Sequence, residues 1–227
     1  TSTYEKSIMF SDFLRHQKLW EYIRSDLESD TDLAHDYLHV QRVYKWARRI
    51  ANTMGVDEDL AGAMALIHDI VNVPKESDLR SQGSTLSAQF GAEILPKVGY
   101  GEDEVRQIVE AVRTCSWSRG LQPTSALGKV LQDADRLDAI GAIGIARNMA
   151  CAQAMRSRGN TGTFYCAEDP KGLLGRGLND KIYAIDHYEK KLMKLIDGFH
   201  SEIAQKEALR RHQFMKLFVE QFFEDLQ

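Results

Sequence analysis

Apolar residues recur at intervals of three and four positions along almost the whole chain of 227 residues. This spacing places them on one face of an α-helix, and no run shows the strict alternation of a half-buried strand. The pattern therefore predicts an all-α protein. Helices are expected over residues 8–28, 37–54, 58–69, 84–97, 102–116, 125–139, 141–157, 180–197 and 200–225.

Three of these helices have a recognisable start. Asp57 precedes "EDLAGAMALI", Gly101 precedes the acidic turn "EDE", and Asn179 or Asp180 precedes "KIYAIDHYEKKLMKLI". Asp and Asn side chains can accept hydrogen bonds from the first N–H groups of a helix, and acidic residues favour its positive end. These positions therefore predict helix N-termini.

The last expected helix has an apolar side and a charged side. The apolar side carries Ile203, Phe214, Leu217, Phe218, Phe222 and Leu226. A helix with this pattern usually docks on the core of its own chain. A surface between copies of the chain is the alternative, so an oligomer remains open.

Three irregular stretches, residues 73–84, 118–125 and 158–179, separate the expected helices. The last is the longest and the richest in glycine, which is typical both of a linker and of a lid over a site. A chain of this length with 43% hydrophobic residues can build one large core. We therefore expect a single domain over residues 1–227.

The charged residues nearly cancel, with 29 Lys and Arg against 33 Asp and Glu, and the pI is about 6.0. No global field would hold the chain on a long nucleic acid or an anionic membrane. Three scattered cysteines form no CxxC pair, and the longest apolar run, residues 139–146, is too short to span a bilayer. A cytoplasmic protein is expected.

The stretch "AGAMALIHDIVNVPK" at residues 61–75 ends an apolar helix with His68 and Asp69. Such groups are costly to bury unless they are paired or bound to a metal. On a continuing helix they would point about a hundred degrees apart, but a helix end would let both reach one cation. A helix-terminal histidine beside an exposed aspartate is the simpler interpretation of an isolated dipeptide.

Two further segments carry candidate ligands. In "LAHDYLHVQRV", His35 and His39 lie four residues apart on one face of a starting helix, with Arg42 close by. In "VLQDADRLDAIGAIGIAR", Asp135 and Asp138 share a helical face beside an apolar stripe. Carboxylates next to so much aliphatic surface need a partner, and a metal, an arginine or a helix cap would each serve.

Taken in order, these segments resemble the HD-domain superfamily of metal-dependent phosphohydrolases. Its signature is a histidine, a later His-Asp doublet and a more distant aspartate in a helical core. The segments "AHD..H..RV", "HDI" and "DADRLDAIGAIG" are similar to those of small stand-alone bacterial HD hydrolases, and the resemblance runs over about residues 31–197. It implies an HD core over about residues 31–150 and a C-terminal helical extension over about residues 179–227.

The resemblance implies metal binding by His39, His68, Asp69 and Asp135. The metal would be a divalent ion, Mn, Co, Ni, Fe, Mg or Zn, and it would activate water for attack on phosphorus. The catalytic candidates are Asp69, His35 and Asp138. His35 could support the metal ligands or transfer protons, with a structural role as the alternative, and Asp138 could orient the water or pair with Arg42 or Arg136. Arg42, Lys75 and Arg136 are the cations that could meet phosphate charge, and solvent-exposed charges are the alternative.

Two positions depart from the family pattern. Asn72 stands soon after the doublet, where many HD hydrolases carry an acidic residue, and Asn cannot accept a proton at neutral pH. Cys115 stands where similar stand-alone members commonly have a histidine, and a soft thiol there could alter metal preference. Both support the alternative of an HD-fold binding or regulatory module with little or no hydrolase activity.

Two other enzyme classes fit the sequence less well. "KVLQDADRLDAIG" contains the DxD of haloacid-dehalogenase-like phosphatases but lacks the strand that should precede it, and "GAIGIA" lacks the G-x-G-x-x-G spacing of a dinucleotide fold. The small residues of "GAIGIA" instead suit close helix packing. The resemblance to HD hydrolases thus implies a phosphohydrolase for a small phosphorylated substrate, a nucleotide or similar ester.

Overall fold

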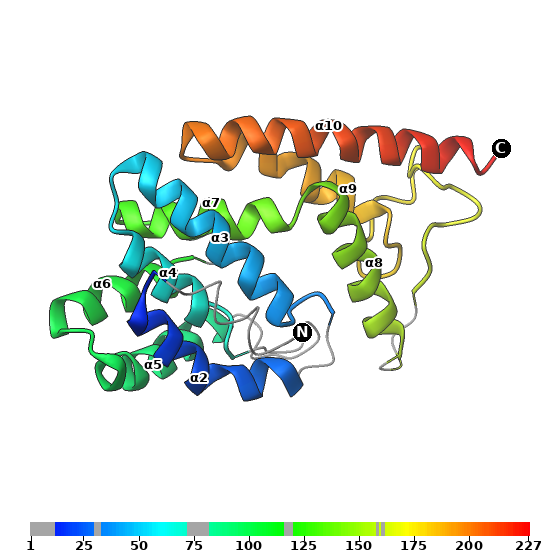
Figure 1. Cartoon of the computed structure of the whole chain (residues 1–227). Coiled ribbons are helices and arrows are strands. Elements are labelled where there is room, and N and C mark those ends of the chain that lie inside the picture. Colours follow the sequence, from blue (N-terminus) through cyan, green and yellow to red (C-terminus); the bar gives the residue numbers. More distant parts are fainter. Residues whose placement is uncertain (1–11, 30–32, 72–81, 116–119, 158, 160–161) are drawn as a thin grey trace. The chain divides into compact units, whose positions relative to one another are not determined.

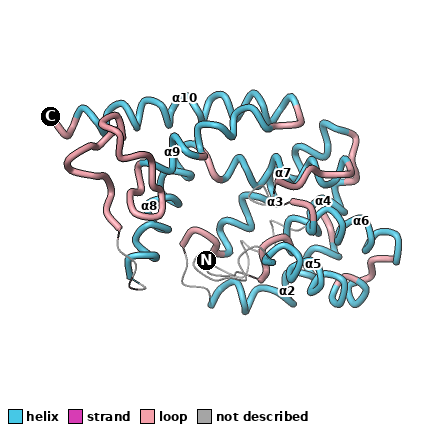
Figure 2. Tube along the Cα trace, turned by 180° about the vertical axis from the view of Figure 1, so that it is seen from behind, coloured by secondary structure: helices cyan, strands magenta, loops and turns pink. Residues whose placement is uncertain are grey.

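The structure is a computed structural model that describes residues 12–29, 33–71, 82–115, 120–157, 159 and 162–227. Within these ranges the chain forms helices and loops and no named strand, as Figure 2 shows. The prediction of an all-α protein is confirmed. The chain divides into two compact units, one built mainly from residues 35–134 with the N-terminal segment and one from residues 135–227 with residues 32–34.

The helices of the first unit follow the expected ranges closely (Figure 1). They are α2 (Leu14–Ser29), α3 (Tyr37–Met54), α4 (Glu58–Ile67), α5 (Gly83–Ile94), α6 (Glu102–Arg113) and α7 (Ala126–Asp138), with a short 3-10 helix η2 (Pro96–Val98) after α5. The last four residues of α7 belong to the second unit. The part of the first expected helix before residue 12 lies outside the described residues.

Helix α4 is the centre of the first unit and contacts α2, α3, α5 and α6. Every residue from Leu60 to Ile67 is buried, so α4 has no solvent-facing side over these residues. A helix that is apolar all round can be stable only inside a core. As the sequence predicts, Asp57 caps α4 by accepting hydrogen bonds from the backbone N–H groups of Asp59 and Leu60.

A polar network holds α2 against α4 and α6. Arg15 bonds the carboxylates of Asp59 and Glu104, each at 2.9 Å, and the Tyr100 hydroxyl donates to Asp59 at 2.5 Å. Glu104 also accepts from the backbone N–H of Gly101, which confirms the predicted start of α6. Because these side chains hydrogen-bond to one another, their polar atoms have partners at the edge of the apolar core.

The fully buried His16 of α2 is held at both ring nitrogens. Nε2 lies 2.8 Å from the backbone oxygen of Asp59, and Nδ1 lies 2.8 Å from the Tyr44 hydroxyl. A carbonyl oxygen can only accept, so Nε2 carries a proton, and the Tyr44 hydroxyl can donate to Nδ1 of the neutral ring. Burial favours this neutral form and lowers the pKa of His16 despite the nearby Asp59 carboxylate.

The second unit contains α8 (Gly141–Ser157), α9 (Asp186–Lys190), the 3-10 helix η4 (Leu192–Gly198) and α10 (Glu202–Glu224). Helix α10 packs on α8 and η4. Gly141 has φ 75°, and a Cβ there would lie 3.0 Å from the Arg211 side chain. Arg211 also donates to the Leu137 carbonyl at the end of α7. The small residue at this turn therefore permits the close helix approach that the sequence predicts.

The single helix expected over residues 180–197 is wrong, because α9 begins only at Asp186 and η4 replaces its second half. The backbone N–H of Thr163 donates to Ile182 O, and the N–H of Ala184 donates to Thr163 O. These long-range bonds occupy backbone groups that a helix would use. Asp180 does not start a helix either, since its carboxylate bonds His187 and Lys190.

The apolar face expected on α10 is partly wrong. Phe214 and Leu217 are 50% and 63% exposed, whereas Ala204, Ala208 and Met215 are buried. Phe218 and Phe222 do meet aromatic rings of their own unit, Tyr188 and Tyr165 respectively. Docking of α10 within its unit is confirmed, on a face rotated from the expected one.

Among the helices of the described residues, none has the length and hydropathy of a transmembrane segment. The expectation of one domain stays a prediction.

We predict that Gly62→Ala destabilises the protein by about 1–3 kcal/mol through overpacking. A Cβ at Gly62 would lie 2.3 Å from Cε1 of His16, and the hydrogen bonds at both ring nitrogens prevent the ring from moving aside. Chemical denaturation of Gly62→Ala in the wild-type and in the His16→Ala background measures this coupling. Equal costs in the two backgrounds would contradict the explanation.

Acidification should also destabilise the protein through His16. Its native pKa is lowered from 6.5, so below that pH the unfolded chain binds more protons than the native chain, and stability falls as pH falls. Thermal unfolding between about pH 7.5 and about pH 5.5 should show a smaller pH-dependent loss in His16→Gln than in wild type. A pH-dependent loss in His16→Gln as large as in wild type would contradict this assignment to His16.

Candidate metal centre

The start of α3 positions two histidines, His39 in the first turn of the helix and His35 just before its cap residue, so the expected shared helical face is wrong. Asp36 caps this helix by accepting a hydrogen bond at 3.1 Å from the backbone N–H of His39. His39 is fully buried, His35 is 7% exposed, and their ring centroids are 6.2 Å apart. The cap therefore fixes the backbone of the same residue whose imidazole enters the site. The sequence offers a signal for this cap, an aspartate directly before a helical run.

The end of α4 supplies the next imidazole. Helix α4 stops at Ile67, and His68 is its C-terminal cap residue. Nδ1 of His68 lies 2.7 Å from the Ala65 carbonyl oxygen. Because that oxygen can only accept, Nδ1 carries the proton and Nε2 keeps the lone pair that a metal ion requires. The backbone of α4 thus sets the tautomer of His68.

Asp69 follows in the turn after α4. Its Oδ2 atom is 3.9 Å from Nε2 of His39, and its side chain remains 25% exposed. The rings of His39 and His68 have centroids 5.3 Å apart. The helix end therefore brings an imidazole and a carboxylate of adjacent residues towards the same buried histidine.

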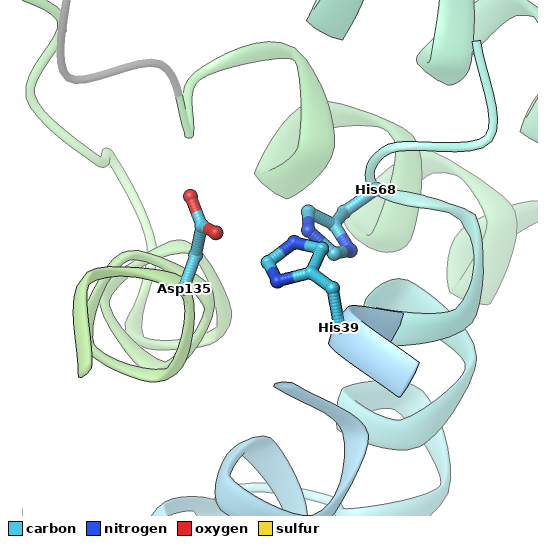
Figure 3. Close-up of side chains that lie close together, drawn as sticks. All are labelled: His39, His68 and Asp135. Carbon is cyan, nitrogen blue, oxygen red and sulfur yellow. The ribbon is translucent and has the colours of Figure 1, made fainter. Parts of the chain in front are cut away.

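Asp135 of α7 completes the group. Ligand atoms of His39, His68 and Asp135 all lie within 4.8 Å of one another (Figure 3). Two imidazole nitrogens and a carboxylate oxygen at this separation could hold a metal ion. Imidazole and carboxylate together suit Mn²⁺, Fe²⁺, Co²⁺, Ni²⁺ or Zn²⁺.

The remaining predicted site residues have different environments. Asp138 is 3% exposed, and Arg136 is 5% exposed and donates to the Gly198 carbonyl. Arg42 is half-buried on α3. Lys75 lies outside the described residues, as does Asn72. The roles of His35, Asp138, Arg42 and Arg136 stay predictions.

Sequence reasoning missed Arg147 of α8. Its Nη1 atom lies 3.3 Å from the Asp138 carboxylate and donates to the Asp138 backbone oxygen. Its Nε donates at 2.7 Å to the Ala34 carbonyl, one residue before His35. Arg147 therefore ties the end of α7 to the segment that leads into α3. The segment "VLQDADRLDAIGAIGIAR" ends on this arginine, but a partner 113 residues away leaves no local signal in the sequence.

Comparison with known proteins identifies the family. The family described as "HD domain" matches residues 36–140, and the chain is 32% identical over 221 residues to the uncharacterized protein YpgQ of Bacillus subtilis, covering 94% of this chain and 96% of YpgQ. The chain belongs to the HD-domain superfamily. His39, His68, Asp69 and Asp135 all lie within the matched range of this HD domain.

Two solved structures are similar to this HD-domain protein over almost its whole length. The crystal structure of B. subtilis YpgQ in complex with ADP is 29% identical with a TM-score of 0.69, covering 93% of this chain and 94% of that chain. An HD-superfamily hydrolase from Bacillus thuringiensis is 28% identical with a TM-score of 0.66, covering 93% and 96%. These similarities extend beyond the HD domain into α9 and α10.

Removal of the Arg147 charge should destabilise the protein. Arg147→Met would leave the almost fully buried Asp138 carboxylate without this cation, at a cost of about 3 kcal/mol. Denaturant unfolding should show that cost, and Arg147→Lys should lose less because it keeps the charge. Asp138→Asn in the Arg147→Met background should recover part of the loss. A double variant as unstable as the sum of the two single variants would refute the pairing.

Proposed function

We propose that this HD-domain protein is a metal-dependent phosphohydrolase whose substrate is a nucleotide or a similar small phosphate ester. The observation that carries the proposal is the His39, His68 and Asp135 group, with its ligand atoms within 4.8 Å of one another. The HD-superfamily hydrolase among its structural relatives supports the reaction class. The ADP in the YpgQ complex supports a nucleotide.

His39, His68, Asp69 and Asp135 would hold a divalent ion. The tautomer of His68 fits this role, since its Nδ1 bond to Ala65 directs the Nε2 lone pair away from the backbone. Such an ion supplies Lewis acidity, lowering the pKa of a bound water and polarising a phosphoryl oxygen. Its identity among Mn, Co, Ni, Fe, Mg and Zn is left open by this donor set.

The residues around that group would move protons and bind phosphate. His35, with its ring centroid 6.2 Å from that of His39, is the candidate for proton transfer. Arg42, Arg136 and Lys75 are the candidate phosphate contacts, and Asp138 would orient water or hold its arginine partner. Asn72 cannot be a general base, so the base is not the acidic residue that many HD hydrolases carry there.

The charge balance supports a small substrate, and three scattered cysteines without a CxxC pair support a cytoplasmic setting. A formal charge of −4 gives no attraction to a long nucleic acid or an anionic membrane. A phosphate ester would instead be met by single arginines and lysines near the site. An oligomer is compatible with this proposal.

A second candidate function is an HD-fold module that binds a metal and a ligand with little or no turnover. The observations that favour it are Asn72 and Cys115, which depart from the pattern of similar hydrolases. A binder of this kind would be stabilised by its ligand without consuming it.

Metal content and turnover test the proposal together. Elemental analysis of protein purified without added metal should find about one transition metal ion per chain, as expected for one four-residue donor set. His68→Ala and Asp69→Ala should each lose that metal. With a panel of nucleotides, their rate of phosphate or pyrophosphate release should fall at least about 100-fold. Asp103→Ala removes an exposed carboxylate of α6 and should change neither quantity.

Three results separate the alternatives. Metal binding with turnover that Asp69→Ala abolishes supports the hydrolase. Metal binding with ADP-induced thermal stabilisation but no product from any nucleotide supports the binding module. A protein that retains no metal after reconstitution with Mn²⁺, Co²⁺ or Ni²⁺ would contradict both the hydrolase and the metal-containing binding module.

A further inference from the structure

The second unit contains a cavity that shares no residue with the candidate metal centre. Its volume is about 480 Å³, and it lies between the C-terminal half of α8 and the segments 162–167 and 180–184. The lining is mostly apolar and includes Met155, Phe164, Tyr165 and Ile182. Small-molecule sites in proteins typically have about 300–1,000 Å³ and a lining of this kind.

The walls of this cavity are fixed by bonds within the second unit. Thr163 exchanges backbone hydrogen bonds of 2.8 and 3.0 Å with Ile182 and Ala184. The Asn148 side chain of α8 donates to the Ala184 carbonyl at 3.1 Å. The Tyr165 ring meets Phe222 of α10 edge-on, with centroids 5.9 Å apart. A cavity whose walls are already ordered costs a ligand little conformational entropy.

The charges that line the cavity are unbalanced towards positive. Asp180 bonds His187 and Lys190, and although burial alone would raise its pKa, these hydrogen bonds lower it to about 2. Its negative charge is therefore already compensated. The other two charged lining residues are Lys181 and Arg156, whose guanidinium donates to the Gly162 carbonyl.

We propose that this cavity binds a small amphipathic organic anion. The apolar or aromatic body would lie against Phe164, Met155 and Ile182, where the exposed ring of Phe164 offers a face for stacking. The carboxylate, sulfonate or phosphate would lie between Arg156 and Lys181. The metal-centre residues play no part, so this site stands whether or not the chain hydrolyses phosphate esters.

The first test uses 8-anilinonaphthalene-1-sulfonate, an aromatic anion that becomes fluorescent in apolar surroundings. Titration of the full chain should show saturable binding of one dye per chain. Arg156→Glu combined with Lys181→Glu should weaken binding at least tenfold, because each reversal replaces an attraction by a repulsion. Ala152→Phe, which places a ring in the cavity, should abolish the saturable phase.

Two control variants exclude less specific dye binding. Lys206→Glu with Lys216→Glu makes the same charge change at exposed positions of α10 and should keep the wild-type affinity. Leu173→Ser with Leu174→Ser removes two leucines that are 79% and 81% exposed, and it should also keep that affinity. Circular dichroism verifies that each variant is folded. Non-saturable binding, or equal affinity in the Arg156 and Lys181 double variant and its charge-matched control, would overturn the proposal.

Displacement of the dye distinguishes two sources of the anion. ADP and 1-naphthoate share an aromatic ring and negative charge but differ in carrying a phosphate or a carboxylate. Displacement by ADP, lost in Ala152→Phe, would support a nucleotide ligand at this cavity. Displacement by 1-naphthoate alone would support an organic acid. Failure of both to displace the dye would count against an anion site.

Discussion

The burial of α4 on every side from Leu60 to Ile67 is the constraint on which the first unit depends. A helix apolar on every side needs neighbours all round, and α2, α3, α5 and α6 supply them. That burial carries a consequence for chemistry, since the first residues beyond the apolar run must satisfy their polar atoms inside the protein. His68 does so by bonding Ala65 through Nδ1, which leaves Nε2 for a ligand. The apolar core and the candidate metal centre therefore have one structural origin.

Three residues outside the candidate donor group fix the orientation of neighbouring segments. Asp36 caps α3 and sets the backbone of His39, while the His16 ring, held at both nitrogens, lies against Gly62. Arg147 joins the end of α7 to the carbonyl of Ala34. None of the three is a candidate metal ligand. Of the three, the Asp36 cap acts directly on the backbone of a candidate ligand, His39.

The chain offers two different kinds of recognition. The group of His39, His68 and Asp135 presents nitrogen and oxygen donors suited to a cation. The cavity beside α8 presents an apolar lining with Arg156 and Lys181, suited to an anion with an apolar body. Its walls depend on the backbone hydrogen bonds of Thr163. The same bonds keep the residues around Ile182 out of the helix that the sequence predicts there. The segment that departs from the sequence pattern is thus the one that forms the cavity.

The sequence by itself determined those helices whose bounds depend on residues close by in the chain. The bounds of α3 and the Asp57 cap of α4 follow from local spacing, and the motif pattern named the site histidines and aspartates. Only the tertiary structure decided the break before Asp186, the exposed face of Phe214 and the partner of Asp138. These features depend on contacts between residues that are distant in the sequence: the backbone hydrogen bonds of Thr163, the packing of α10 on α8 and the contacts of Arg147. No local sequence pattern encodes such contacts.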